Sequence, residues 1–208
     1  MKYLLPLSIL LGLTLSSCSE TNTTDALAAH QSAQATIAGN TELSEMSLYN
    51  LESEWQNEDD ETVKLVQLNG KVQLVAMMYT NCTYACPRIV ADLKRIEAKL
   101  DNYKKEDVGI VLVTMDPEND TPEKLQQFAT DNNLDPDRWT LLTSDEMNIQ
   151  ELAVLLNMKY KNGGKGEIAH SNIITVLNAG GEIIHQQEGL GKDPDETVKT
   201  IDGLLRSI

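Results

Sequence analysis

The stretch that decides the fold is Val72-Gln73-Leu74-Val75-Ala76-Met77-Met78-Tyr79-Thr80-Asn81-Cys82-Thr83-Tyr84-Ala85-Cys86-Pro87. Its first eight residues are almost all apolar, which is typical of a strand buried on both faces of a sheet. Two cysteines follow, and Pro87 stands where proline is tolerated in the first turn of a helix. The stretch therefore predicts a buried strand, a loop that carries two thiols, and a helix.

The apolar pattern on both sides of this stretch predicts an α/β domain. Strands alternate with helices and end in a hairpin, which indicates a mixed sheet. A cysteine motif between the first core strand and its helix is typical of a thioredoxin-like domain. We therefore expect a thioredoxin-like mixed sheet flanked by helices, with an N-terminal β-hairpin extension. The expected strands are 51–56, 62–65, 72–79, 107–115, 173–177 and 182–185, with a further short strand before the third helix; the expected helices start at Pro87, at Thr121 and at the capping-box pattern Thr143–Glu146, and a last one surrounds 198–205.

The N-terminus has the pattern of an export signal. An apolar run, Leu4–Leu15, is too short to span a bilayer, which takes roughly 20 residues. Leu15-Ser16-Ser17-Cys18 then resembles the lipobox of bacterial lipoproteins. On this resemblance residues 1–17 are a signal peptide and Cys18 is lipidated; the alternative is an ordinary cleavage site with an incidental cysteine. We expect an exported protein, lipid-anchored to a bacterial membrane, with its domain on the extracytoplasmic side.

The rest of the chain divides into a tether and one domain. Residues 18–46 are rich in small and polar residues without a sustained apolar period, which predicts a flexible tether. Residues 47–208 suit a single domain with one core. The formal net charge of −15 argues against binding to nucleic acid or to anionic lipid. An acidic surface serves solubility, or it steers a basic partner.

Cys82 and Cys86 are a pair of thiols in a compartment that permits disulfides. Cys86 is expected at the helix start, where the helix dipole favours a thiolate. A structural disulfide would close so small a loop that it would stabilise the fold little. Thiol–disulfide exchange is a second reading, although thioredoxin-type enzymes have two intervening residues and this pair has three. Peroxidase chemistry fits poorly, because Val75 and Tyr79 stand where peroxiredoxins carry Pro and Thr.

A copper site is the remaining reading, since soft thiolates select Cu(I). Two thiolates leave a copper ion in need of a third ligand. His30 lies in the tether, and His185 lies within a hairpin strand where a surface or packing role is expected. His170 follows a Gly-rich segment and precedes a predicted strand, whose entry loop faces the cysteine motif in a thioredoxin-like fold. His170 is therefore the candidate third ligand.

From about Ser47 to the C-terminus the sequence resembles the SCO/SenC copper chaperones, which assist assembly of the CuA centre of cytochrome c oxidase. The combination of the cysteine spacing, an Asp-Pro-x-x-Asp-Thr-Pro motif and a later His carries the resemblance. It departs from the common pattern at Thr83, at Asn119 and at Ala169. The matching residues are Trp55, Leu68–Lys71, Tyr79–Cys82, Cys86-Pro87, Val113–Pro122, Trp139–Thr143 and His170-Ser171.

The resemblance implies a metallochaperone, rather than an enzyme, that binds copper through Cys82, Cys86 and His170. Its partner would be cytochrome c oxidase subunit II or another copper-accepting protein. The alternative is a thiol–disulfide oxidoreductase that reduces the cysteines of a copper acceptor, with a Cys82–Cys86 disulfide as its oxidised form. A redox or copper sensor that delivers nothing is a third reading.

Other residues near the motif could also take part. Met77, Met78 and Met115 carry thioether sulfur, but their places in buried strands favour core packing. Asp116 and Asp120 follow the second core strand and should lie near the site. For Asp120 we expect a helix cap at the helix that starts at Thr121.

Overall fold

The computed structural model describes residues 43–162 and 168–207. The predicted signal peptide, the lipidation site Cys18, the predicted tether up to residue 42 and His30 lie outside the described residues. Within the part that is described, no helix has both the length and the apolar character to cross a bilayer. The described residues belong to one compact unit.

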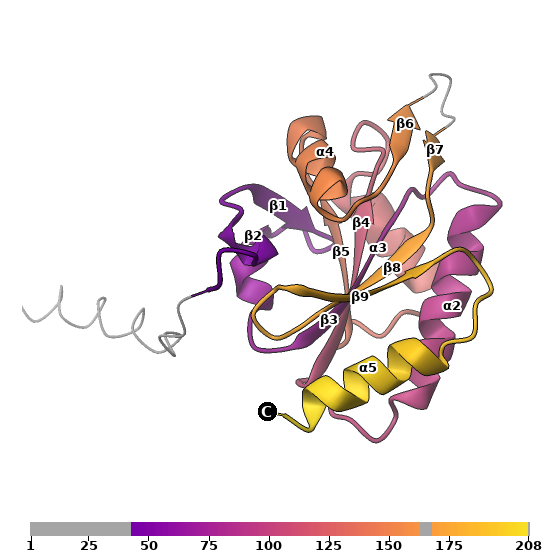
Figure 1. Ribbon diagram of the computed structural model, residues 1–208. Helices are drawn as coiled ribbons and strands as arrows, with labels where there is room; N and C mark the ends of the chain where they lie inside the picture. The colour runs from indigo at the N-terminus through magenta and orange to yellow at the C-terminus, as the bar shows by residue number, and fades with distance from the viewer. Residues whose placement is uncertain (1–42, 163–167, 208) are drawn as a thin grey trace, which may run out of the picture. The chain divides into compact units, whose positions relative to one another are not determined.

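A seven-stranded mixed sheet forms the centre of the domain (Figure 1), in the order β2-β1-β5-β4-β3-β8-β9. β3, β4 and β5 run parallel, and antiparallel strands extend the sheet on both sides. A separate two-stranded sheet pairs β6 with β7. The strands are β1 (Glu54–Asn57), β2 (Thr62–Lys64), β3 (Val72–Met78), β4 (Val108–Thr114), β5 (Trp139–Thr143), β6 (Tyr160–Asn162), β7 (Ile168–His170), β8 (Ile173–Leu177) and β9 (Ile183–Glu188).

Helices cover both faces of this sheet. The helices are α2 (Ala85–Lys99), α3 (Pro122–Asp131), α4 (Glu146–Leu155) and α5 (Asp195–Leu205), and two short 3₁₀ turns, Leu48–Asn50 and Leu65–Leu68, flank the first hairpin. One apolar cluster lies between the sheet and α2, α3 and α5, and the other lies between the sheet and α4. Side chains of β3 alternate between the two clusters, with Leu74 and Ala76 on one face of the sheet and Val75 and Met77 on the other. Figure 1 shows α4 on the side of the sheet away from α2 and α5.

The predicted fold class is confirmed, and two local predictions are wrong. The capping-box pattern predicted that Thr143 would cap the third helix, but Thr143 ends β5 and Asp145 is the cap, accepting a hydrogen bond from Asn148 N–H at 2.8 Å. His170 was expected on a loop, but it ends β7, a strand that the sequence did not predict. Both differences arise because pairing with a neighbouring strand places these residues in strands, which the local sequence pattern does not indicate.

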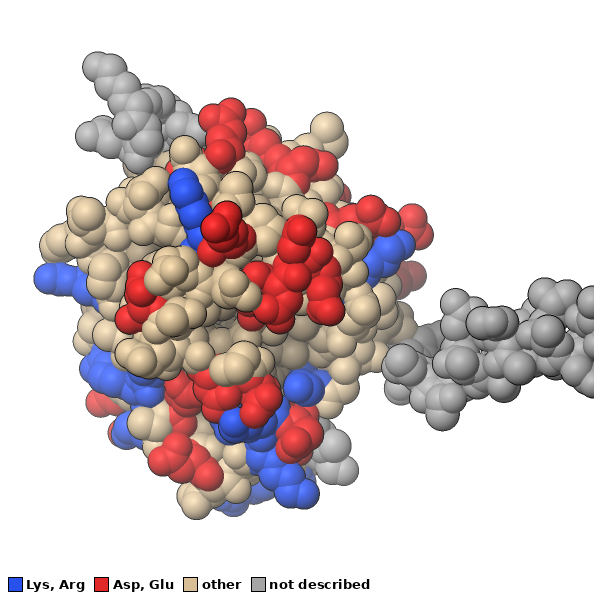
Figure 2. Space-filling model, turned by 180° about the vertical axis from the view of Figure 1, so that it is seen from behind, with Lys and Arg blue, Asp and Glu red and all other residues tan. Residues whose placement is uncertain are grey.

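The acidic excess of the sequence lies on the surface. Figure 2 shows Asp and Glu side chains over the centre and upper part of one face, while Lys and Arg gather towards its lower part. This is the surface expected of a chain with a formal net charge of −15.

Candidate metal and thiol site

Three segments that are far apart in the sequence meet at one edge of the sheet. β3 ends at Met78, and the loop after it carries Cys82 into the start of α2. β4 pairs with β3 in parallel up to Thr114, so the segment after β4 emerges beside the cysteine loop. β8 runs antiparallel to β3 with Ile174 opposite Ala76, so the chain just before β8 also arrives at this edge. β7, with His170, lies in that part of the chain.

The two thiols lie against each other at the first turn of α2. Cys86 N–H points at Cys82 Sγ at 3.4 Å, and Tyr79 N–H points at Cys86 Sγ at 3.4 Å. Both cysteines are free thiols, so the structure shows the pair in its reduced form. Cys82 is half-buried and Cys86 is buried, with 1% of its surface exposed.

The pKa values of the two thiols move in opposite directions. Burial works to raise the pKa of Cys82, but N–H groups of the first helical turn, including that of Cys86, and the Cys86 side chain stabilise its thiolate and hold the pKa below the ordinary value. Burial strongly raises the pKa of Cys86, and the nearby Cys82 and Asp120 add to that effect. The sequence predicted that the helix start would stabilise the Cys86 thiolate. That prediction is wrong, because the N–H groups of the first turn of α2 stabilise the thiolate of Cys82, which precedes the helix.

His170 lies at the end of β7, where it pairs with Tyr160 of β6. Its Nδ1 lies 2.9 Å from the Ser171 carbonyl oxygen, an acceptor, so Nδ1 carries the proton and Nε2 is left to bind a metal. Burial lowers the pKa of His170, which keeps the imidazole neutral at physiological pH. Ala169 offers no carboxylate to orient the ring, and the carbonyl of Ser171 takes that role.

Tyr79 lies between the cysteines and His170, a position that the sequence pattern did not reveal. Its ring meets the His170 ring edge to face, with centroids 6.2 Å apart and an interplanar angle of 77°. Within residues 43–162 and 168–207, no three Cys, His, Asp or Glu side chains lie close enough together to hold a metal ion. The segments that carry the predicted ligands thus meet at one edge, with Tyr79 between the cysteines and the histidine, but Cys82, Cys86 and His170 do not converge closely enough to share one ion.

Asp120 is fully buried and does not cap α3. Thr121 is the cap of α3 and accepts from Lys124 N–H, so the cap predicted for Asp120 is wrong. The Asp120 carboxylate instead accepts from Thr80 N–H at 3.0 Å and from the hydroxyls of Thr80 and Thr114. It therefore ties the cysteine loop to the end of β4. This role could not be found from the helix signal, because it depends on the pairing of β3 with β4.

The remaining candidates take structural roles. Asp116 accepts two hydrogen bonds from the Asn119 amide, at 2.9 and 3.0 Å. His185 Nε2 lies 3.2 Å from Thr197 Oγ1, on the face where α5 packs, which agrees with the predicted packing role. Core packing is confirmed for the three methionines, which are buried: Met77, Met78 and Met115.

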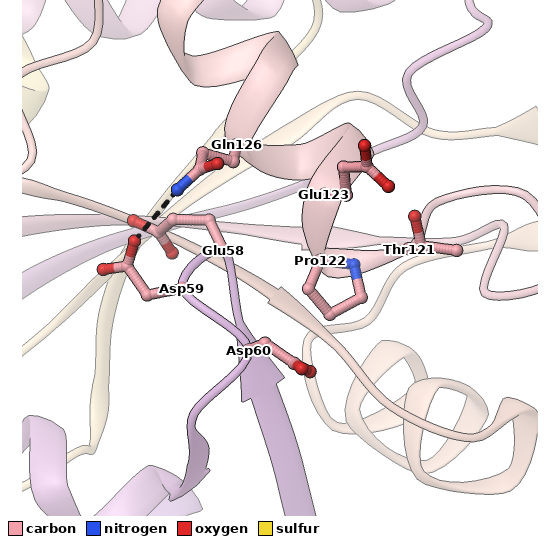
Figure 3. Close-up of a pocket in the computed structure, with 7 residues that line it drawn as sticks. All are labelled: Glu58, Asp59, Asp60, Thr121, Pro122, Glu123 and Gln126. Atoms are coloured by element: carbon pink, nitrogen blue, oxygen red, sulfur yellow. Dashed lines mark hydrogen bonds between the residues drawn. The ribbon is translucent and has the colours of Figure 1, made fainter.

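A hollow of about 420 Å³ lies elsewhere, between the β1–β2 turn and the start of α3 (Figure 3). Asp59 accepts a hydrogen bond from Gln126 at 3.3 Å across it. Glu58 reaches the sheet instead and accepts from Leu141 N–H at 2.8 Å. The lining residues include neither Cys nor His, and the carboxylate contacts hold the N-terminal hairpin against the sheet and α3.

Comparison with known families identifies the family of this chain. The SCO1/SenC family model matches residues 43–206, which include the cysteine loop, the Asp120 segment and His170. The chain belongs to the SCO1/SenC family. The family predicted from the sequence motifs is therefore confirmed.

Individual relatives of this SCO1/SenC protein cover most of its domain. A SCO1 protein homolog of Bacillus subtilis (strain 168) is 29% identical over 147 residues, covering 69% of this chain and 76% of the relative. The structure of BsSco, described as a Sco family cytochrome c oxidase assembly protein with a disulfide switch, has a TM-score of 0.65 at 28% identity, covering 74% of this chain and 91% of its own. The structure of Arabidopsis thaliana ScoI with copper bound has a TM-score of 0.62, and the match covers 74% of this chain and 94% of that chain. At 19% identity this likeness shows that the fold is shared.

Proposed function

We propose that this SCO1/SenC protein binds a copper ion as cargo through Cys82, Cys86 and His170. The observation that carries the proposal is the arrangement at one sheet edge of two adjacent thiols and an imidazole whose Nδ1 is hydrogen-bonded to the Ser171 carbonyl, which leaves Nε2 unprotonated. The copper bound in the Arabidopsis ScoI structure supports the choice of metal. The acceptor we propose is the CuA centre of cytochrome c oxidase subunit II, in line with the assembly role described for BsSco.

The chemistry of the donor set fits copper in both valences. Thiolates are soft ligands that suit Cu(I), and imidazole suits either valence. Two thiolates and a neutral imidazole give a site of charge −1 with Cu(I) and a neutral site with Cu(II). The ligands must be deprotonated, so loading releases protons from the thiols. An oxidised Cys82–Cys86 pair would not bind, which makes loading depend on the redox state of the compartment.

The membrane position is a separate part of the proposal. Lipidation of Cys18 would anchor the protein, and a tether over residues 18–46 would let the domain reach a membrane-bound oxidase. This part is tested by mass spectrometry of the N-terminal peptide: a diacylglyceryl group on Cys18 supports it, and a mature chain that starts elsewhere without lipid contradicts it.

A Cu(I) competition titration of the reduced full-length protein tests the ligand set. We expect one Cu(I) per chain and a loss of at least about tenfold in affinity for His170→Ala, because a ligand is removed. His185→Ala is the matched control and should bind within twofold of wild type. An affinity for His170→Ala equal to that of the control would contradict the proposed site.

Delivery needs its own experiment. Copper-loaded protein is mixed with the apo soluble domain of an oxidase subunit II, and the two are separated and assayed for metal. Transfer of copper supports the chaperone function. Copper that stays on the donor, with an acceptor that loads from free Cu(I), contradicts delivery and favours a sensor.

A thiol–disulfide reductase is the second candidate, and the asymmetry of the two thiols favours it. An accessible Cys82 with a lowered pKa beside a buried Cys86 is the arrangement of an attacking and a resolving thiol. If this function dominates, Cys82→Ser abolishes reduction of an oxidised subunit II domain while His170→Ala leaves it intact. Loss of activity in His170→Ala as well would count against it.

A further inference from the structure

An aromatic ring and a cation lie together on the surface next to Cys82. Tyr84 directly precedes α2 and is 67% exposed, which is unusual for so large an apolar side chain. The guanidinium of Arg88, one helical turn later, lies over the Tyr84 ring, with its central carbon 4.4 Å from the ring centroid. This cation–π contact holds the positive charge at the first turns of α2, beside the loop that carries the accessible thiol.

The charge of Arg88 stands alone in this part of the chain. Between residues 72 and 91 it is the one charged residue, although 24% of all residues are Asp, Glu, Lys or Arg. It forms no ion pair with any carboxylate in the part of the chain that the structure describes. The other exposed residues around the two cysteines are neutral: Asn81, Thr83 and Pro87. The cation is therefore available to a partner that approaches Cys82.

The acidic remainder of the protein sharpens this choice. A formal net charge of −15 repels an acidic partner from most of the surface. At physiological ionic strength exposed charges are screened beyond about 8 Å, so at contact distance the nearest charge decides. An acidic segment is then disfavoured elsewhere and accepted beside Arg88, which gives specificity for one place on the molecule.

We propose that Tyr84 and Arg88 form a docking surface for the acceptor protein, and that the segment docked there carries a carboxylate next to its own cysteine. The Arg88 guanidinium pairs with that carboxylate, and the Tyr84 ring keeps the guanidinium in place. Tyr and Arg are residue types that carry much of the binding energy at protein interfaces. That the partner accepts copper rests on the proposed function, whereas the preference for an acidic segment belongs to this surface and is tested without copper.

The experiment compares two short peptides, each with one cysteine in a mixed disulfide with thionitrobenzoate. One peptide has a glutamate on each side of its cysteine, and the other has glutamines there. In the reduced, metal-free, full-length protein the Cys82 thiolate attacks the peptide sulfur. A new S–S bond forms, and thionitrobenzoate leaves with the electron pair of the broken bond. Its absorbance gives the rate, and Cys82→Ser gives the background to be subtracted.

Arg88→Gln should slow the reaction of the acidic peptide about threefold, the size of one exposed ion pair, and leave the glutamine peptide within about 1.5-fold of wild type. Lys71→Gln is the matched control. It removes the same charge at the opposite end of β3, whose seven residues span roughly 20 Å, and should change neither rate. An unchanged rate for the acidic peptide in Arg88→Gln overturns the proposal. Equal slowing of both peptides also overturns it, because the thiol itself would then be altered.

A double-mutant cycle tests whether Tyr84 acts through Arg88. Tyr84→Leu should lower the rate of the acidic peptide relative to the glutamine peptide, whereas Tyr84→Phe keeps the ring and should match wild type. In the Arg88→Gln background Tyr84→Leu should have no further effect on this ratio. The same further effect in both backgrounds overturns the positioning role of the ring. No readout contains copper, so a failed copper titration would refute the proposed function and leave these rates standing.

Discussion

The two thiols of this site differ because the start of α2 exposes one sulfur and encloses the other. Cys82 lies outside the first turn, in front of N–H groups, while Cys86 lies under the helix against the core. Position within the turn, and not the cysteine spacing, decides which of the two thiolates is stabilised.

We expect iodoacetamide to alkylate Cys82 at least about tenfold faster than Cys86 at neutral pH. Cys82 is half-buried with a lowered pKa, and Cys86 is buried with a raised pKa. Peptide mass spectrometry of the reduced protein at short reaction times measures both rates. Cys82→Ser and Cys86→Ser serve as controls for peptide assignment; equal rates, or faster labelling of Cys86, would refute this order.

Asp120→Asn should lower the free energy of unfolding by about 2–4 kcal/mol. The substitution replaces one carboxylate oxygen with an NH₂ group, so buried donors of Thr80 and Thr114 lose an acceptor. Urea denaturation measures the loss. Glu118→Gln is the matched control on the same segment, since Glu118 is exposed, and should stay within about 0.5 kcal/mol of wild type. Equal stability of the two variants would show that the Asp120 contacts are dispensable.

The sequence could predict the ligand candidates but not what lies between them. The types and spacing of Cys82 and Cys86, and the place of His170 before a strand, are visible along the chain. The contact of Tyr79 with His170 and that of Asp120 with Thr80 are not visible, because they depend on the register between β3, β4 and the segment before β8. An apolar strand end followed by Tyr is equally compatible with a tyrosine that only packs.

Among the secondary elements, long buried strands and amphipathic helices were predicted well, and short paired strands were missed. β3 and β4 could be predicted because each is an almost continuous run of apolar residues. β6 and β7 are three residues each and have no such run, so only their mutual pairing makes them strands. That miss placed His170 on a loop.

The β8–β9 turn supports the N-terminal segment, and one glycine makes this contact possible. Gly181 has a φ of 83°, and its carbonyl accepts from Leu48 N–H at 3.0 Å. A Cβ on Gly181 would lie 2.6 Å from a ring carbon of Tyr49 and 2.7 Å from Ser47 Oγ. The turn and the first 3₁₀ turn therefore fit only with glycine at this position.

Gly181→Ala should destabilise the protein by about 2–4 kcal/mol, from the left-handed backbone and the overlap together. Gly180→Ala is the matched control, because its Cβ would meet nothing closer than Asn178 Oδ1 at 3.5 Å. Chemical denaturation compares the two. If Gly181→Ala is as stable as Gly180→Ala, the close fit of the N-terminal segment is not needed for the fold.

At the scale of the whole molecule, the acidic surface should make stability depend on pH. Burial raises the pKa of Glu58, and Asp59 and Glu61 add to it, whereas the N–H of Leu141 works against it. A carboxyl whose folded pKa is raised binds its proton more strongly in the folded state. The contribution of Glu58 to the free energy of unfolding is therefore most favourable in acid, and it is lost as the pH rises through the pKa of the folded state.

Glu58→Gln should raise the Tm by about 1–3 °C at pH 7, where wild type bears the buried charge, and the gain should vanish near pH 4. The amide oxygen of Gln can still accept from Leu141 N–H. Thermal unfolding followed by circular dichroism across this pH range measures the difference, with Glu54→Gln, an exposed residue of β1, as the control. A Tm gain that is the same at both pH values would rule out titration of Glu58 as its cause.

The meeting of three distant segments at one sheet edge also sets when the protein can work. The proposed ligands come together only after β3 has paired with β4 and with β8, contacts that close long loops and form late in folding. A chain that has not finished crossing a membrane, or one cut before β7, would carry both thiols but would lack His170, the third proposed ligand. If the proposed ligand set is right, an unfinished chain would bind copper through its thiols alone and hold it less tightly than the folded protein.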